Sequence, residues 1–289
     1  MSTTEGAHRA DGARAVRPAG SANGGTAAAD ALVERVLASP RGLSVLVVHA
    51  HPDDDTLSTG PLLAWLARHG ADVGLVTCCR GERGEIVPGA LPEGAGDHEL
   101  VEAREGELDA ACRALGVRRH WFLGKSPWRV PGRAERHYED SGMRWVTPTV
   151  AGPAEDAGEL SLSRSPIEEE LADLLAGLDR TTPDVVLSYD DGGGYGHPDH
   201  VRVHQVVQRA AAARDLPFVQ VVSNDDVPGA VTSGARWFGT DEPAVADAVL
   251  TALHCYRTQL TVVGGDADPH IRHVGGQRQE IPRRVGLVG

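Results

Sequence analysis

The segment LSVLVVHAHPDDDTLSTG, residues 43–60, decides the fold prediction. Five of its first six residues are apolar and three are β-branched valines, which is typical of a strand buried on both faces of a parallel sheet. Similar apolar runs lie at residues 72–78, 120–124, 184–190 and 217–222. We therefore expect a set of buried strands spread along most of the chain.

Between these strands, apolar residues recur with the 3.6-residue period of amphipathic helices. The patterns lie within residues 62–66, 108–115, 167–178 and 203–210. The third helix should begin with Ser165 as N-cap, Pro166 as first residue and Glu168 as capping-box acid. Alternating strands and helices predict a Rossmann-like α/β fold, a mostly parallel sheet with helices on both faces. Ligands bind such sheets at the carboxyl ends of the strands, so the active site is expected there.

The composition narrows the class of protein. The 289 residues, 41% of them hydrophobic, can form a full core, and no apolar stretch approaches the roughly 20 residues of a membrane span. The net charge is −13, whereas a protein that binds a phosphate backbone needs an excess of basic side chains. We expect no membrane span and no nucleic-acid partner. Residues 1–28 have the composition of a disordered tail, which leaves residues 29–289 as a single domain.

The cysteines and the N-terminus bear on the compartment. Cys78, Cys79, Cys112 and Cys255 form no CxxC pair, so we expect reduced core residues. The N-terminal segment lacks the apolar stretch of a secretory signal, which favours a cytoplasmic protein. The sequence does not fix the oligomeric state, and a homo-oligomer is compatible with it.

Imidazole and carboxylate side chains follow the first predicted strand directly. His51 and Asp54 are three residues apart and can converge on one point in a helical turn, whereas Asp53 between them projects elsewhere. This spacing gives two candidate metal ligands and one free carboxylate. The alternative is an acidic turn in which an aspartate caps a helix.

A second polar cluster, in SYDDGGGYGHPDH, follows the fourth predicted strand and falls on the same rim of the sheet. Its members are Tyr195, His197, Asp199 and His200. With His51 and Asp54, His200 would form an N₂O ligand set with an open coordination place, which is how catalytic zinc sites differ from structural ones. Two HPD motifs at two strand ends therefore favour zinc or a similar divalent metal.

These motifs carry a family resemblance. AHPDDD and GGYGHPDH, together with GERGE at 81–85 and DSGM at 140–143, resemble the PIG-L/LmbE-like family of zinc-dependent N-deacetylases. Within it, the chain is most similar to the mycothiol-pathway deacetylases of N-acetylglucosaminyl-inositol. The resemblance covers about residues 43–222 and fades beyond them.

The resemblance implies a metal-dependent hydrolase that removes acetyl from an N-acetylglucosamine unit in a glycoconjugate or pseudodisaccharide. The implied cofactor is Zn²⁺, with Fe²⁺ as an alternative, bound by His51, Asp54 and His200. Asp53 would be the general base, with His197 and Tyr195 beside the substrate carbonyl. The implied substrate contacts are Arg104, Asp140 and Ser58, and the implied supporting acids are Asp199 and Asp55.

Three of these roles have plainer alternatives or depart from the family pattern. Arg104 could snorkel past its helix face, and Asp140 could be an ordinary turn residue. The family usually has glutamate where this chain has Asp55, which is one methylene shorter. Its C-terminal HxSQ or HxTQ pattern has Tyr256 here in place of the histidine.

Other functions are compatible with the same motifs. The chain could cleave mycothiol S-conjugates, or it could be a pathway-specific deacetylase of an antibiotic intermediate, which the two departures favour. It could also be a catalytically silent metal- and sugar-binding protein. Intact Asp53 and His197 argue against the silent protein, because a binding module needs no base.

Residues 86–98 and 125–165 are rich in glycine and proline and should shape the pocket wall.

Overall fold

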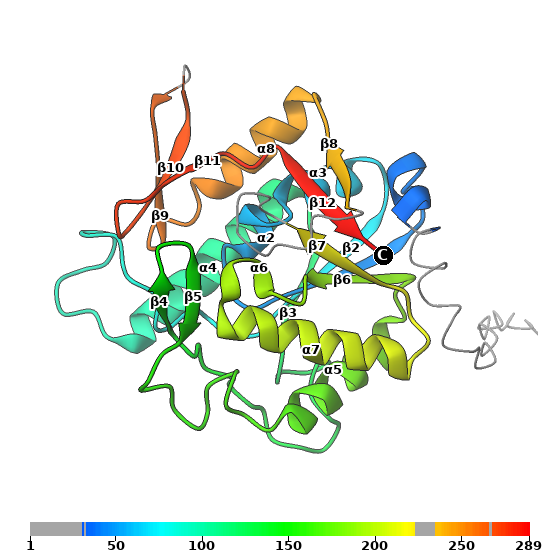
Figure 1. Ribbon diagram of the computed structural model, residues 1–289, viewed down its shortest axis with the longest axis horizontal. Coiled ribbons are helices and arrows are strands. Elements are labelled where there is room, and N and C mark those ends of the chain that lie inside the picture. The colour runs from blue at the N-terminus through cyan, green and yellow to red at the C-terminus, as the bar shows by residue number, and fades with distance from the viewer. Residues whose placement is uncertain (1–30, 32, 223–234, 266–267) are drawn as a thin grey trace, which may run out of the picture.

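A seven-stranded mixed sheet forms the centre of the computed structural model, which describes residues 31, 33–222, 235–265 and 268–289. Its strand order is β3-β2-β1-β6-β7-β12-β8 (Figure 1). The pairs β1–β2, β1–β6, β2–β3 and β6–β7 are parallel, and β12 runs antiparallel to β7 and β8. The mostly parallel sheet is thus confirmed, while the predicted tail lies outside the described residues. The strands are β1 Ser44–His49, β2 Asp72–Thr77, β3 Arg119–Phe122, β6 Val185–Tyr189, β7 Phe218–Val222, β8 Arg236–Gly239 and β12 Arg284–Val288.

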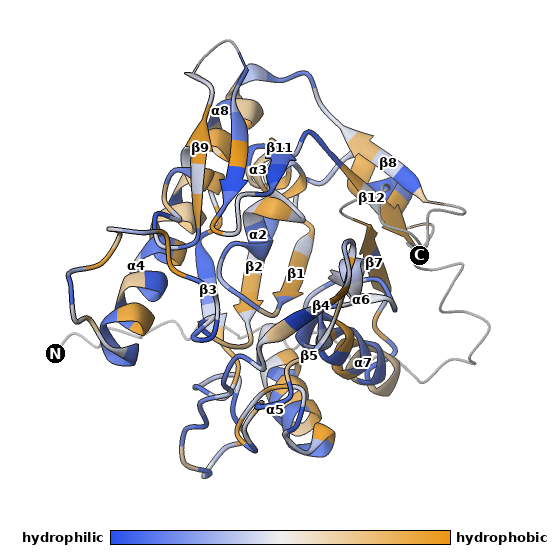
Figure 2. Ribbon diagram, turned by 60° about the vertical axis from the view of Figure 1, so that its left-hand side comes forward, coloured by the Kyte–Doolittle hydropathy of each residue, from blue (hydrophilic) through white to orange (hydrophobic). Residues whose placement is uncertain are grey.

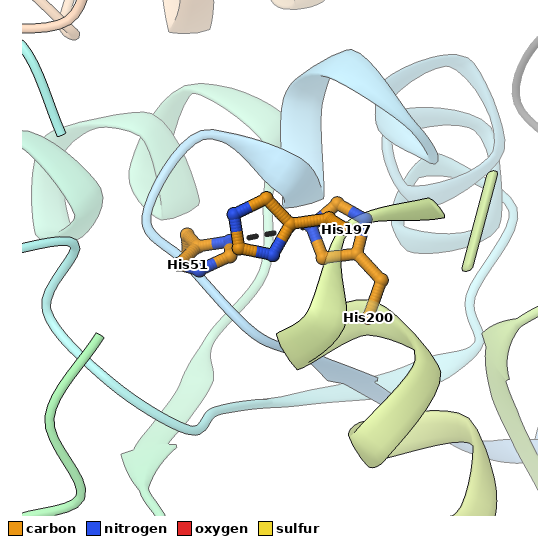
Figure 3. Close-up of side chains that lie close together, drawn as sticks. All are labelled: His51, His197 and His200. Atoms are coloured by element: carbon orange, nitrogen blue, oxygen red, sulfur yellow. Dashed lines mark hydrogen bonds between the residues drawn. The ribbon is translucent and has the colours of Figure 1, made fainter. Parts of the chain in front are cut away.

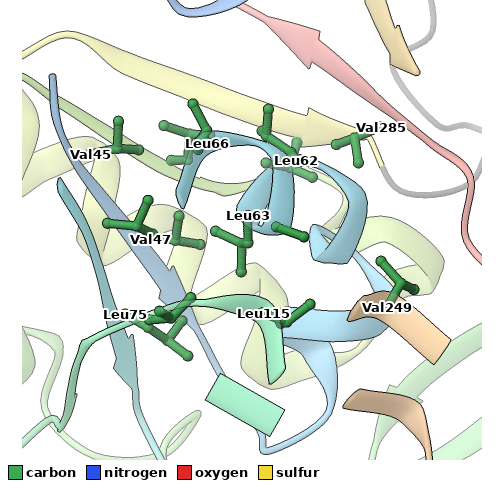
Figure 4. Close-up of a cluster of buried hydrophobic side chains, with 14 of the residues drawn as sticks. Val45, Val47, Leu62, Leu63, Leu66, Leu75, Leu115, Val249 and Val285 are labelled. Carbon is green, nitrogen blue, oxygen red and sulfur yellow. The ribbon is translucent and has the colours of Figure 1, made fainter. Parts of the chain in front are cut away.

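Helices cover both faces of the sheet, as expected. One face packs against α3 (Gly60–Arg68), α4 (Asp97–Leu115) and α8 (Pro243–Leu253), and the other against α5 (Ile167–Thr181) and α7 (Pro198–Ala213). Successive strand residues point to opposite faces, so Val45 and Val47 of β1 join the first core and Leu46 and Val48 the second. Figure 4 shows part of the first core, where these two valines face the leucines of α3.

The predicted start of α5 is wrong. The helix begins at Ile167, and its N-cap is Pro166, with φ −59° and ψ 119°. Ser165 lies one residue too early, and its hydroxyl accepts a hydrogen bond from Arg136 Nη2 at 3.0 Å. This tertiary contact occupies the side chain that was expected to cap the helix.

Two small antiparallel sheets were not predicted. One is the hairpin of β4 (Met143–Thr147) and β5 (Val150–Pro153), which lies beside the short helix α6 (Gly193–Gly196) (Figure 2). The other joins β9, β10 and β11 and projects from the body of the molecule (Figure 1). Its strands are β9 Leu260–Val263, β10 His270–His273 and β11 Arg278–Glu280. None of the helices in the described part of the chain is long and apolar enough to cross a membrane.

Candidate active site

The two predicted clusters meet at the carboxyl ends of β1 and β6, which are neighbouring strands. After β1, the next strands of the sheet in chain order, β2 and β3, are added on one side of β1. β6 pairs with the other side of β1, and β7 follows beyond β6. The boundary between β1 and β6 is therefore the topological switch point, where α/β sheets bind their ligands. The short helix α2 (Asp54–Leu57) follows β1, and α7, which starts at Pro198 as predicted, follows β6.

His51, Asp54 and His200 converge at this point. His51 Nδ1 lies 3.2 Å from Asp54 Oδ2. The same nitrogen lies 3.2 Å from His200 Nε2 (Figure 3). His200 Nε2 lies 3.4 Å from Asp54 Oδ1. Burial alone would raise the pKa of Asp54, but His200 and His51 hold that pKa well below its ordinary value. The carboxylate is therefore charged.

The far nitrogens of both rings have acceptors. His200 Nδ1 lies 3.2 Å from Gly193 O, and His51 Nε2 lies 3.2 Å from Asp199 Oδ2. With protons on those nitrogens, the lone pairs of His51 Nδ1 and His200 Nε2 face each other and the Asp54 carboxylate. Two lone pairs and an anion in mutual contact suit a cation, and acceptors behind the imidazoles are typical of zinc sites. This donor set fits a divalent metal.

Two other groups of side chains could also take part in holding an ion. Ligand atoms of His51, His197 and His200 lie within 4.8 Å of one another, and so do those of His51, Cys79 and Asp199. His197 is thus closer to the cluster than sequence spacing alone indicated. Its ring centroid is 4.5 Å from that of His51 and 4.8 Å from that of His200 (Figure 3).

His197 forms the N-cap of α7, and this fixes its tautomer. Its Nδ1 accepts a hydrogen bond from Asp199 N at 3.2 Å. Burial and the neighbouring His51 and His200 lower the pKa of His197 well below its ordinary value. The neutral ring therefore carries its proton on Nε2 and is a hydrogen-bond donor there. Tyr195 lies beside it, with ring centroids 6.0 Å apart.

Asp53 has an unusual backbone conformation. It lies immediately before α2 with φ 101° and ψ −31°, in a region that costs a non-glycine residue about 1–3 kcal/mol. Asp53 is the N-cap residue of α2 by position, but its side chain makes no capping hydrogen bond, so the alternative of an aspartate that caps the helix through its side chain does not hold for Asp53. Burial and the adjacent Asp54 carboxylate raise the pKa of Asp53 well above its ordinary value.

The two departures from the family pattern meet in one hydrogen bond. Tyr256 Oη donates to Asp55 Oδ1 at 2.5 Å, and both side chains are buried. Burial raises the pKa of Asp55 to about 6, against the hydrogen bonds from Tyr256 and Thr56. Sequence reasoning noted each residue but could not pair them, because they lie 201 positions apart.

Sequence reasoning missed Tyr189, the last residue of β6. Its hydroxyl donates to Asp54 Oδ2 at 2.6 Å and accepts from Ala50 N at 2.7 Å. Tyr189 also stacks on His200 at 4.1 Å between ring centroids. The only signal in the sequence was a tyrosine at the carboxyl end of a predicted strand, next to the second motif.

Arg104 points inward from α4, and it is 2% exposed, so the snorkelling alternative is wrong. Its guanidinium donates to the carbonyls of Gly81, Gly84 and Glu85, with 3.3 Å to Gly84 O and 3.1 Å to Glu85 O. These carbonyls belong to the GERGE segment. Arg104 therefore ties that loop to α4 beside the active site.

Asp140 and Ser58 are also buried, and Asp140 lies next to His51. Asp140 Oδ1 lies 3.7 Å from His51 Nε2, and the same oxygen accepts from Gly142 N at 2.7 Å. Charged and polar neighbours, His51 first among them, outweigh burial and hold the pKa of Asp140 below its ordinary value. Ser58 is 8% exposed and ends α2.

The β4–β5 hairpin lies beside Tyr195 and α6. The Trp145 ring lies 5.8 Å from that of Tyr195, and Trp145 and Val146 are 46% and 58% exposed. The hairpin packs closely on α6, because a Cβ at Gly196 would lie 3.0 Å from Ala151 O. Part of the 125–165 segment therefore borders the site.

A Rossmann-like sheet with this His–Asp cluster at its switch point is the kind of site that a metal-dependent hydrolase uses, and the comparisons specify an N-deacetylase. The chain belongs to the PIG-L family: the family model described as GlcNAc-PI de-N-acetylase matches residues 46–211. The sequence-based resemblance is thus confirmed.

Two relatives extend this similarity. The chain is 47% identical to a 1D-myo-inositol 2-acetamido-2-deoxy-alpha-D-glucopyranoside deacetylase of Nocardiopsis dassonvillei, over 76% of this chain and 85% of that protein. It is 38% identical to the protein of the same name from Actinosynnema mirum, over 75% of this chain and 81% of the relative.

Two solved structures share the fold. The N,N'-diacetylchitobiose deacetylase of Pyrococcus horikoshii has a TM-score of 0.52 at 19% identity, over 78% of this chain and 79% of that one. A deacetylase from the biosynthesis pathway of teicoplanin has a TM-score of 0.50 at 21% identity, over 74% and 84%. At these identities the likeness confirms the α/β fold.

Proposed function

We propose that the protein removes the acetyl group from N-acetylglucosamine linked to inositol, or from a closely related amino-sugar glycoconjugate. The proposed cofactor is Zn²⁺, with Fe²⁺ as the alternative, held by His51, Asp54 and His200. The observation that carries the proposal is the convergence of one ring nitrogen each of His51 and His200 on the charged Asp54. The 47% identity to a deacetylase of that inositol glycoside supports the substrate class.

The chain's own contacts prepare the ligand set. Asp199 and Gly193 O hold the two imidazoles in the tautomers that leave a lone pair free. Tyr189 and the backbone N–H of His51 hold Asp54 Oδ2, at 2.6 Å and 2.9 Å. When bound, a divalent metal supplies Lewis-acid polarisation of the amide carbonyl and a lowered pKa for a water molecule.

Asp53 is the proposed general base. Its carboxylate lies beside the ligand set without belonging to it. A bound divalent cation would lower the raised pKa of Asp53, so that the ionised carboxylate can take a proton from the attacking water. The protonated Asp53 then gives this proton to the leaving amine, which completes amide hydrolysis to acetate and a free amino sugar.

His197 is the proposed donor to the carbonyl oxygen. Because its Nδ1 accepts from Asp199 N, its Nε2–H can donate to the negative charge that develops on that oxygen. Tyr195, next to His197, is placed to add a second donor.

The proposed substrate contacts are Arg104, Asp140 and Ser58. Arg104 already donates to three loop carbonyls, so we assign it mainly to holding the GERGE loop against the substrate. Trp145 and Val146 present apolar surface beside Tyr195 and would face the group attached to the sugar.

An assay of acetate release distinguishes the proposed deacetylase from a mycothiol S-conjugate amidase and from a catalytically silent binding protein. The protein should release acetate from N-acetylglucosaminyl-inositol faster than from free N-acetylglucosamine, and the His200→Ala variant should release none. Cleavage of a mycothiol S-conjugate without acetate release from the inositol substrate would instead identify an amidase. Absence of turnover on all three substrates by the metal-loaded protein would identify a silent binding protein.

A further inference from the structure

Asp55 is a buried acid that the proposed chemistry does not use. It is 1% exposed, and its carboxylate accepts hydrogen bonds from three sides. Tyr256 Oη donates to Oδ1 at 2.5 Å, Thr56 Oγ1 donates to Oδ2 at 2.8 Å, and Asp53 N donates to Oδ1 at 3.3 Å. Asp55 Oδ1 thus accepts hydrogen bonds both from the hydroxyl of Tyr256, which is distant in sequence, and from the backbone N–H of Asp53, the proposed base.

The backbone of Asp53 needs such support. Its φ of 101° is in a region that side chains with a Cβ rarely adopt, and such residues persist only where the surroundings fix them. On the C-terminal side, Asp53 O accepts from Thr56 N at 2.9 Å and from Leu57 N at 2.8 Å. On the N-terminal side, the Asp53 N–H is held by Asp55.

Tyr256 reaches this point from a remote part of the chain. It lies in the turn between α8 and β9, and its side chain is fully buried in the core that includes α3 and α4. Since the ring is packed, its hydroxyl is a fixed donor. The position of Asp55 is therefore set by a residue outside the active-site motifs.

We propose that Tyr256 and Asp55 are positioning residues for Asp53. The contact runs from the Tyr256 hydroxyl through the Asp55 carboxylate to the Asp53 N–H. It holds Asp53 at positive φ and so directs the Asp53 carboxylate toward the reacting water. The inference rests on the proposed role of Asp53 as base.

The Tyr256→Phe variant tests this inference, because it removes one hydroxyl and keeps the ring. Misplacing a catalytic group slightly can cost up to 10²-fold, so we expect kcat for acetate release to fall roughly 10–100-fold. KM and metal content should stay unchanged. The matched control is Tyr138→Phe, whose buried hydroxyl donates to Asp173 Oδ2 at 2.9 Å outside the site. Both variants should lose similar thermal stability, but only Tyr256→Phe should lose kcat.

A rescue experiment keeps the inference testable if Tyr256→Phe folds poorly. Asp55→Glu lengthens the acid and Tyr256→His shortens the donor, so each alone should lower kcat and the double variant should recover most of it. Failure of the double variant to exceed Asp55→Glu would overturn the pairing.

The outcome for Asp53→Asn separates this inference from the proposed function. If Asp53→Asn keeps full kcat, the base assignment itself is wrong. If Asp53→Asn is inactive while Tyr256→Phe and the control both turn over normally, only the positioning role is refuted.

Discussion

Asp199 Oδ2 lies 3.2 Å from His51 Nε2, and the Asp199 side chain is fully buried. The same carboxylate accepts hydrogen bonds from Ser141, with 2.9 Å between Ser141 N and Oδ2, and from the Ser141 hydroxyl. Ser141, in the DSGM segment, therefore holds the Asp199 carboxylate, and this carboxylate in turn orients the His51 ring. Orientation of His51 depends on a loop that contributes no proposed metal ligand.

We predict that Asp199→Asn weakens metal binding. An amide cannot serve His51 Nε2–H as a charged acceptor, and loss of such partners costs about 10–100-fold in metal affinity or activity. Competition with a chelator measures the affinity. Ser141→Ala is the matched control, because it keeps the Asp199 charge beside His51 and should change affinity less. Equal affinity of Asp199→Asn and the wild-type protein would contradict this role.

The metal content of purified variants should distinguish the three proposed ligands from His197, the proposed hydrogen-bond donor. His51→Ala, Asp54→Ala and His200→Ala should lose bound metal, because each removes one converging donor atom. His197→Ala should keep it while kcat falls by roughly 10²–10³, the usual cost of one oxyanion donor. Metal loss in His197→Ala would make this residue a ligand.

Replacing the proposed base should affect turnover alone. Asp53→Asn keeps the shape of the side chain and removes its basicity, so kcat should fall by about 10²–10⁴ with KM and metal content little changed. Steady-state kinetics with metal analysis of the same sample measures this. If turnover stays near normal, Asp55 is the next candidate base.

Glu170 should make stability depend on pH. This α5 residue is fully buried, neither of its oxygens has a hydrogen-bond partner within the described residues, and Arg202 Nη1 stays 3.8 Å away. Burial raises the pKa of Glu170 from 4.5 to about 8; of the charged groups around it, Arg202 and Arg136 lower it, and Asp199 and Glu169 raise it. Between these two pKa values the folded state binds more protons than the unfolded state. The free energy of unfolding should therefore fall as pH rises, by at most about 1.4 kcal/mol per pH unit.

Glu170→Gln removes this titration, so the free energy of unfolding should fall less steeply as pH rises. Denaturant unfolding at pH values of about 5.5 and about 8.5 measures the difference. Glu168→Gln, an exposed acid on the same helix, is the control and should keep the wild-type slope. An unchanged slope in Glu170→Gln would show that this carboxyl does not titrate in the window.

The sequence was sufficient where local pattern determines structure. Apolar β-branched runs identified β1, β2, β3, β6 and β7, and the two HPD motifs located the residues that meet at their carboxyl ends. It was insufficient where one segment docks on another. Tyr256 reaches Asp55 only because α8 packs on α3 and α4, and Ser165 fails to cap α5 because Arg136 takes its hydroxyl.

The switch-point location has a consequence for folding. His51 and His200 are 149 positions apart and belong to strands that pair only when β6 docks on β1. The unfolded chain thus contains no preassembled chelator, and an ion that binds only the native state shifts the folding equilibrium toward it. At 100 times the dissociation constant this linkage amounts to about 2.7 kcal/mol. Added chelator should therefore lower the melting temperature of the wild-type protein but not that of His200→Ala, and metal uptake during refolding should report the moment at which the two halves of the sheet join.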